Sequence, residues 1–147
     1  MKQTLIGRAK EIQKFQKYQQ SRKSEFVALY GRRRVGKTYL VRQVFQEQMT
    51  FQLTGLANVG KKAQLAQFYA ELLKYFPENE GITLAKDWFT AFRQLIISLE
   101  KKKTKGKKVI FLDEVPWLGT KRSGFIQGLG WFWNSWAVNQ DIVLVVF

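Results

Sequence analysis

The sequence predicts an α/β fold of three layers, in which a parallel β-sheet is flanked by helices on both faces. Three short, mostly apolar segments, residues 25–30, 109–114 and 141–147, have the composition of strands buried on both faces. Segments with helical periodicity separate them, and this alternation is typical of parallel sheets. A length of 147 residues with 46% hydrophobic residues suits one compact domain.

The first half of the chain is expected to form a helix, a strand, a second helix and a second strand. Apolar residues spaced three apart predict a short amphipathic helix over residues 7–20. Residues 25–30 form a continuous apolar run before a glycine and predict a buried strand. Apolar positions at helical spacing predict a helix over residues 37–48, and a brief strand follows at residues 50–55.

The second half is expected to add three helices and two strands. Two helices are expected over about residues 61–76 and 86–101, with a turn between them that contains proline and glycine. Residues 109–114 predict another buried strand. An aromatic helix over residues 123–139 then leads to a last buried strand at residues 141–147.

Composition excludes several classes of chemistry. Without cysteine or histidine the chain has no disulfide, no thiolate or imidazole metal site and no histidine acid or base. No apolar run approaches the roughly 18 to 20 residues of a membrane span, and no apolar signal core begins the chain, so we expect a cytoplasmic protein without a membrane partner. The net charge of +14 favours a polyanionic partner, which could be nucleic acid or a nucleotide triphosphate.

Residues 31–38, GRRRVGKT, match the phosphate-binding pattern G-x-x-x-x-G-K-[ST] between a predicted strand and a predicted helix. Backbone amides and the helix N-terminus would bind phosphate, Lys37 would add charge for binding and catalysis, and the Thr38 hydroxyl would reach Mg²⁺. The alternative is a plain glycine turn. The expected nucleotide contacts in this segment are Gly31, Arg32, Arg33, Arg34, Val35, Gly36, Lys37, Thr38 and Tyr39.

Three consecutive arginines, Arg32 to Arg34, occupy the middle of this loop. Such loops bind phosphate through backbone N–H groups, so the arginine side chains are free to point elsewhere. They could face the sheet edge, a neighbouring domain or nucleic acid, or they could be solvated surface.

Two acids follow the predicted strand at residues 109–112. Ligands of parallel sheets lie outside the carboxyl ends of the strands, so Asp113 is expected to bind the Mg²⁺ held by Thr38. Glu114 would polarise the water that attacks the γ-phosphate. Two acids after an apolar strand also arise by chance. A further strand lying between the loop strand and this one would suit ATPases with an additional strand.

Five segments together resemble the archaeal-type ATPases of the AAA-like superfamily, in their bacterial ATP-binding branch. They are LIGRAKEI, YGRRRVGKT, FQLTGLANVGKKAQLAQF, FLDEVPWL and RSGFIQGLGWFWNSWA. The resemblance implies a P-loop NTPase fold of the additional-strand type, with ATP and Mg²⁺ as cofactors. It also implies that Arg8, in the entry motif, contacts the base or ribose.

The resemblance further implies an incomplete domain. In relatives the last strand continues into a γ-phosphate sensor, a fifth strand and C-terminal domains. We therefore expect residues 1–147 to be the N-terminal part of a P-loop ATPase domain, truncated before the fifth strand, with the loop strand at an open edge. Hydrolysis is expected in the complete protein, and binding with poor hydrolysis in this chain.

Two basic and aromatic clusters allow alternatives. The lysines between Lys101 and Lys108 could bind DNA, as could the loop arginines, or they could form a solvated connection. Trp131, Trp133 and Trp136 could stack on bases, but their helical spacing favours core packing, whereas Trp117 is expected to be exposed.

Two functions remain open on the sequence. One is an ATPase that hydrolyses MgATP with Lys37, Thr38, Asp113 and Glu114. The other is a nucleotide-gated module that binds nucleic acid or protein without significant turnover. A homo-oligomer also stays open.

Overall fold

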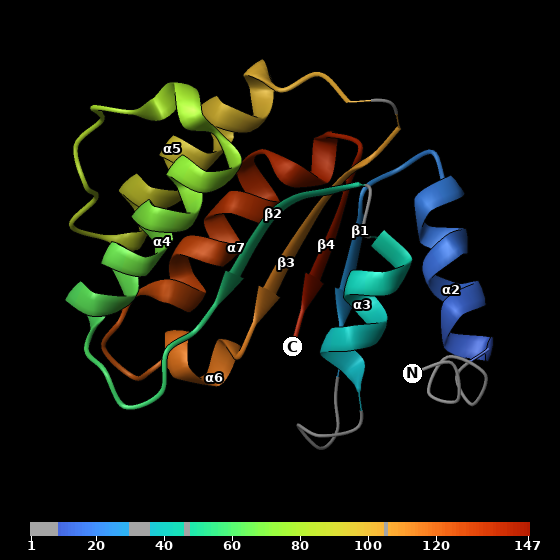
Figure 1. Cartoon of the computed structure of the whole chain (residues 1–147), viewed down its shortest axis with the longest axis horizontal. Coiled ribbons are helices and arrows are strands. Elements are labelled where there is room, and N and C mark those ends of the chain that lie inside the picture. Colours follow the sequence, from blue (N-terminus) through green and yellow to red (C-terminus); the bar gives the residue numbers. More distant parts are fainter. Residues whose placement is uncertain (1–8, 30–35, 46–47, 105) are drawn as a thin grey trace.

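A computed structural model of the chain describes residues 9–29, 36–45, 48–104 and 106–147, in which helices and strands alternate (Figure 1). The strands are β1 (Glu25–Ala28), β2 (Met49–Thr54), β3 (Lys108–Asp113) and β4 (Ile142–Val146). The α-helices are α2 (Ala9–Gln20), α3 (Lys37–Phe45), α4 (Lys61–Tyr75), α5 (Trp88–Lys101), α6 (Val115–Leu118) and α7 (Phe125–Ser135). Short 3₁₀ turns occupy η1 (Pro77–Asn79) and η2 (Ala137–Asn139).

The four strands form one parallel sheet in the order β1-β4-β3-β2. The last strand in sequence therefore lies between the strand that precedes the glycine-rich loop and the strand that ends in Asp113. This arrangement confirms the additional strand expected from the sequence, and it places β1 at an edge of the sheet.

Alternating side chains of the strands divide the interior into two cores. Ile110, Leu112 and Leu144 face a core shared with α4, α5 and α7. Val109, Phe111 and the neighbouring valines of β4 face a second core shared with α2 and α3. Helices on both faces and the parallel sheet between them confirm the three-layer α/β fold.

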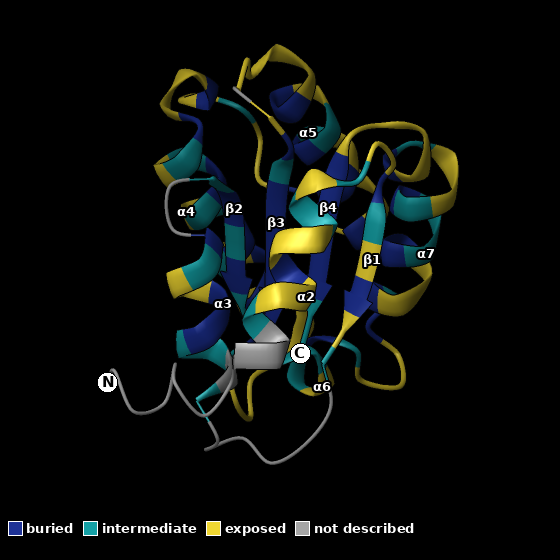
Figure 2. Cartoon of the chain, turned by 90° about the vertical axis from the view of Figure 1, so that its right-hand side faces the viewer, coloured by how far each residue is buried: buried dark blue, intermediate teal, exposed yellow. Residues whose placement is uncertain are grey.

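The expectation that β1 is buried on both sides was wrong. Figure 2 shows exposed residues on β1, whereas β3 and β4 are almost entirely buried. Phe26 is 43% exposed, and its ring packs edge-on against Trp133 at 5.1 Å between centroids. The apolar run encodes a strand, but an edge strand has a neighbour on one side only, so one face is incompletely covered.

Candidate functional site

The helix that follows the glycine-rich loop begins at Gly36 and Lys37. Gly36 has a φ of 74°, a left-handed conformation that favours glycine, and its carbonyl accepts the first helical hydrogen bond from the amide of Leu40 at 2.8 Å. Tyr39 lies half-buried in the first turn of α3. The predicted contacts Arg8, Gly31, Arg32, Arg33, Arg34 and Val35 lie outside the residues that the structure describes, as does the Lys37 side chain.

Thr38 meets Asp113 at the carboxyl end of the sheet. The Thr38 hydroxyl donates a hydrogen bond of 2.9 Å to Oδ2 of Asp113, although 75 residues separate them in the chain. The other carboxylate oxygen, Oδ1, accepts from the backbone amide of Glu114 at 2.9 Å. The fold thus joins the two residues that the sequence predicted would share a metal ion.

Burial governs the electrostatics of Asp113, whose exposed fraction is only 4%. Desolvation raises the pKa of the carboxyl above its ordinary value, and the nearby charge of Glu114 acts in the same direction. Hydrogen bonds from Thr38 and from the Glu114 amide, together with the charge of Arg42, lower the pKa but only partly offset the burial. The charged form of Asp113 is therefore undercompensated.

These groups fit a magnesium ion. Mg²⁺ binds through oxygen ligands, usually one or two protein oxygens together with waters and phosphate oxygens of a substrate. Thr38 and Asp113 supply a hydroxyl and an undercompensated carboxylate side by side. No group of three His, Cys, Asp or Glu residues capable of holding a metal occurs within the described ranges. An ion here would therefore depend on phosphate for its remaining ligands.

Glu114 has an unusual backbone conformation directly after Asp113. Its φ of 58° and ψ of 41° place it in the left-handed region, and it forms the N-cap of α6. Non-glycine residues in this region store strain, which is often found at functional sites. Gly55, at the end of β2, packs so closely that an added Cβ would lie 2.5 Å from the Glu114 carbonyl oxygen. Only glycine therefore fits beside this turn.

A buried glutamine, Gln64 of α4, fixes the segments on either side of Glu114. Its side-chain oxygen accepts from the Leu56 amide at 2.9 Å, and its side-chain nitrogen donates to the Leu56 carbonyl at 2.7 Å. The same nitrogen also donates to the Trp117 carbonyl at 3.2 Å. Gln64 is only 3% exposed, so it links the loop after β2 to α6 in a region poor in water. Sequence reasoning missed both Gln64 and Gly55, although the LTG step after a strand hinted at a close backbone approach.

We expect Gln64→Leu to lower the free energy of unfolding by about 1 to 3 kcal/mol, because it leaves buried backbone groups of Leu56 and Trp117 without a partner. Urea denaturation followed by circular dichroism measures the change. Gln67→Leu is the matched control, since Gln67 lies one turn further along α4 and bonds only to Glu71, at 3.5 Å. Equal losses in the two variants would contradict the linking role of Gln64.

The other sequence candidates lie outside this site. Trp117, expected to be exposed, is half-buried within α6. Trp131, Trp133 and Trp136 pack partly buried against the larger core, as their spacing favoured. The described lysines between Lys101 and Lys108 lie at the amino end of β3, whereas Asp113 ends the same strand. Within the described ranges, no helix is long and apolar enough to cross a membrane.

Comparisons with known proteins agree with this geometry. Residues 5–147 match the model of a family described as an ATPase domain predominantly from Archaea. No curated protein matches the chain.

Proposed function

The chain belongs to the family of ATPase domains found predominantly in Archaea, and we propose that it binds ATP with Mg²⁺ and hydrolyses it at the carboxyl end of the sheet. The match covers almost the whole chain and supports an ATPase-type function in general. The specific assignment of residues rests on the site itself.

The hydrogen bond between Thr38 and Asp113 is the observation that carries the proposal. It joins the helix after the phosphate-binding motif to the acid at the end of β3, and it sets two oxygen ligands side by side at 2.9 Å. In this proposal Thr38 and Asp113 hold Mg²⁺, and Lys37 and the loop amides bind the phosphates. When bound, Mg²⁺ would neutralise negative charge on the phosphate oxygens.

Glu114 is assigned the role of general base. Its carboxylate would accept a proton from a water whose oxygen forms a bond to the γ-phosphorus. The bond between the γ-phosphorus and the bridging oxygen breaks, and that oxygen leaves with the electron pair as part of ADP. The strained backbone at Glu114 and its close contact with Gly55 support this role, because they restrict where the turn can lie.

We expect Lys37→Ala to weaken ATP binding by about 10- to 100-fold, because hydrogen bonds to charged groups contribute about 1.5 to 3 kcal/mol. Titration of a fluorescent ATP analogue in the presence of Mg²⁺ measures the effect. Lys74→Ala is the control, since Lys74 is an exposed lysine near the end of α4. Affinities that are equal in the parent and in Lys37→Ala would refute the proposed site.

A further inference from the structure

Two hollows lie side by side at the amino end of the sheet, opposite the proposed ATP site. Each has a volume of about 500 Å³, and they share Lys102 and Thr104 as a common wall. The first is bordered by β2 and the end of α4, and the second by the start of β3 and the segment before β4. Along β3, the two ends of the sheet are about 16 Å apart, so both sites can be occupied together.

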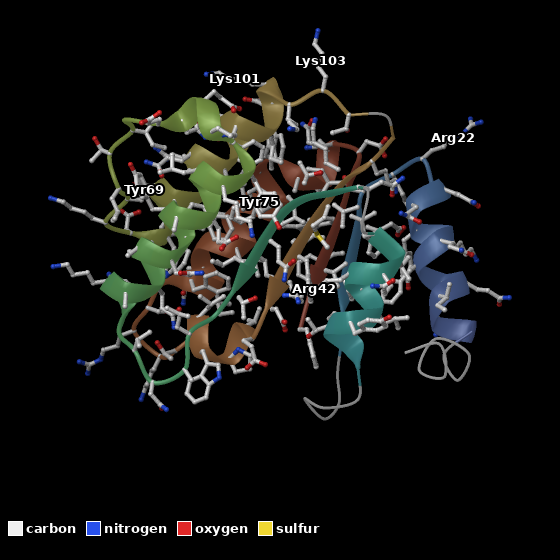
Figure 3. All side chains as sticks on the ribbon, viewed as in Figure 1. Arg22, Arg42, Tyr69, Tyr75, Lys101 and Lys103 are labelled. Atoms are coloured by element: carbon white, nitrogen blue, oxygen red, sulfur yellow. The ribbon has the colours of Figure 1, made fainter. Side chains whose placement is uncertain are left out.

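This end of the molecule is strongly basic. Figure 3 shows Arg22, Lys101 and Lys103 at the same end, with side chains directed outward. Within the described part of the chain, Lys101, Lys102 and Lys103 are exposed and form no ion pair. The acids at this end are partly occupied: Glu100 accepts from Trp136 at 3.3 Å, and Asp141 lies 3.9 Å from Lys107.

Lys107 differs from the other lysines because its ammonium group is enclosed. Its Nζ donates to the Tyr18 carbonyl and the Ser21 hydroxyl, both at 2.7 Å, and also to the Lys23 carbonyl. It therefore ties the end of α2 to β3 and forms a fixed floor for the first hollow. The charges available to a ligand are those of Lys102 and Lys103, with half-buried Lys108.

Each hollow also presents one aromatic side chain. Tyr75 lines the first and Trp136 lines the second, and both are half-buried. Tyr75 packs against Phe51 and Trp136 against Phe132, so the two rings are held in place by the core. Rigid rings on either side of a lysine wall match the way proteins bind single strands, with bases on aromatic rings and phosphates on basic side chains.

We propose that this surface, defined by Lys102, Lys103, Tyr75 and Trp136, binds single-stranded nucleic acid. A duplex hides the faces of its bases and could use only the lysines. A lipid surface fits less well, because none of the large apolar side chains exposed in the described chain lines either hollow. The proposal is independent of ATP hydrolysis.

Fluorescence anisotropy with a labelled oligonucleotide of about 16 nucleotides tests the surface. The parent protein should bind, and Lys102→Glu with Lys103→Glu should weaken binding at least 10-fold and lower the slope of log affinity against log salt by about 2. Lys61→Glu with Lys62→Glu is the matched control, because these exposed lysines start α4 and give the same change in net charge. Affinity for the ATP analogue should be unchanged in both double variants.

Further arms separate the contributions. Trp136→Leu and Tyr75→Leu should each weaken binding without changing the salt slope, because a base stacks on the ring without releasing counterions. Single strands of DNA and RNA are compared, and binding of either supports the proposal, with any preference reporting a contact to the sugar. Equal loss in the control pair, duplex bound as tightly as single strand, or competition by anionic phospholipid vesicles would each overturn it.

Discussion

Replacing Glu114 with glutamine is expected to lower ATP hydrolysis by about 10²- to 10⁴-fold, the usual contribution of a general base. The amide cannot accept the proton of the attacking water, but it keeps the size of the side chain and the turn at φ 58°. ATP affinity should therefore stay within about twofold of the parent value. Single-turnover measurements of phosphate release, with protein in excess over ATP, detect even slow hydrolysis.

Glu78→Gln is the control for this variant, because Glu78 is an exposed acid in η1. It should hydrolyse ATP at the parent rate. If Glu114→Gln also did so, the catalytic role of Glu114 would be wrong. A parent chain that binds ATP without any turnover would favour the alternative function, a nucleotide-gated binding module.

Asp113→Asn is expected to have opposite effects on the empty and the ATP-bound protein. The pKa of Asp113 is raised on folding, so the folded chain binds this proton more tightly than the unfolded chain does. The carboxylate therefore stabilises the fold less as pH rises above its ordinary pKa of about 3.8 and through the folded pKa. At neutral pH, without nucleotide, the asparagine variant should be at least as stable as the parent.

With nucleotide the order should reverse, because the variant loses a charged ligand for Mg²⁺. At a MgATP concentration about 100 times Kd, the parent should gain about 2.7 kcal/mol of stability, and the variant clearly less. Thermal unfolding with and without MgATP, at pH 5 and pH 7, measures both effects. Asp141→Asn, which changes an exposed carboxylate, should behave like the parent. Equal stabilisation of Asp113→Asn by MgATP would remove Asp113 from the metal site.

Local sequence patterns predicted the elements of this fold well. The apolar run before Asp113 and the helical spacing after Thr38 each correspond to an element of the structure, because local periodicity reports which faces are buried. The motif G-x-x-x-x-G-K-[ST] followed by a distant Asp113 also predicted that Thr38 and Asp113 would meet, since parallel strands bring their carboxyl ends to one edge.

Features that depend on tertiary neighbours could not be predicted in this way. Glycine at position 55 is explained only by the nearby Glu114 carbonyl, which belongs to another strand. Gln64 lies on a helix that looks ordinary in sequence, and its partners are backbone groups of two loops. The exposure of Phe26 depends on the place of β1 at the sheet edge. None of these relationships is encoded in local periodicity.

The central position of β4 has a consequence for synthesis on the ribosome. Within the described sheet β1 hydrogen-bonds only to β4, and the Ile142 amide bonds to the Ser24 hydroxyl across 118 residues. At 5 to 20 residues per second, the nascent β1 would wait on the order of ten seconds for its partner. During that time the apolar faces of α2 and α3 have no completed sheet to cover. Early aggregation and chaperone binding should therefore concentrate in the first third of the chain.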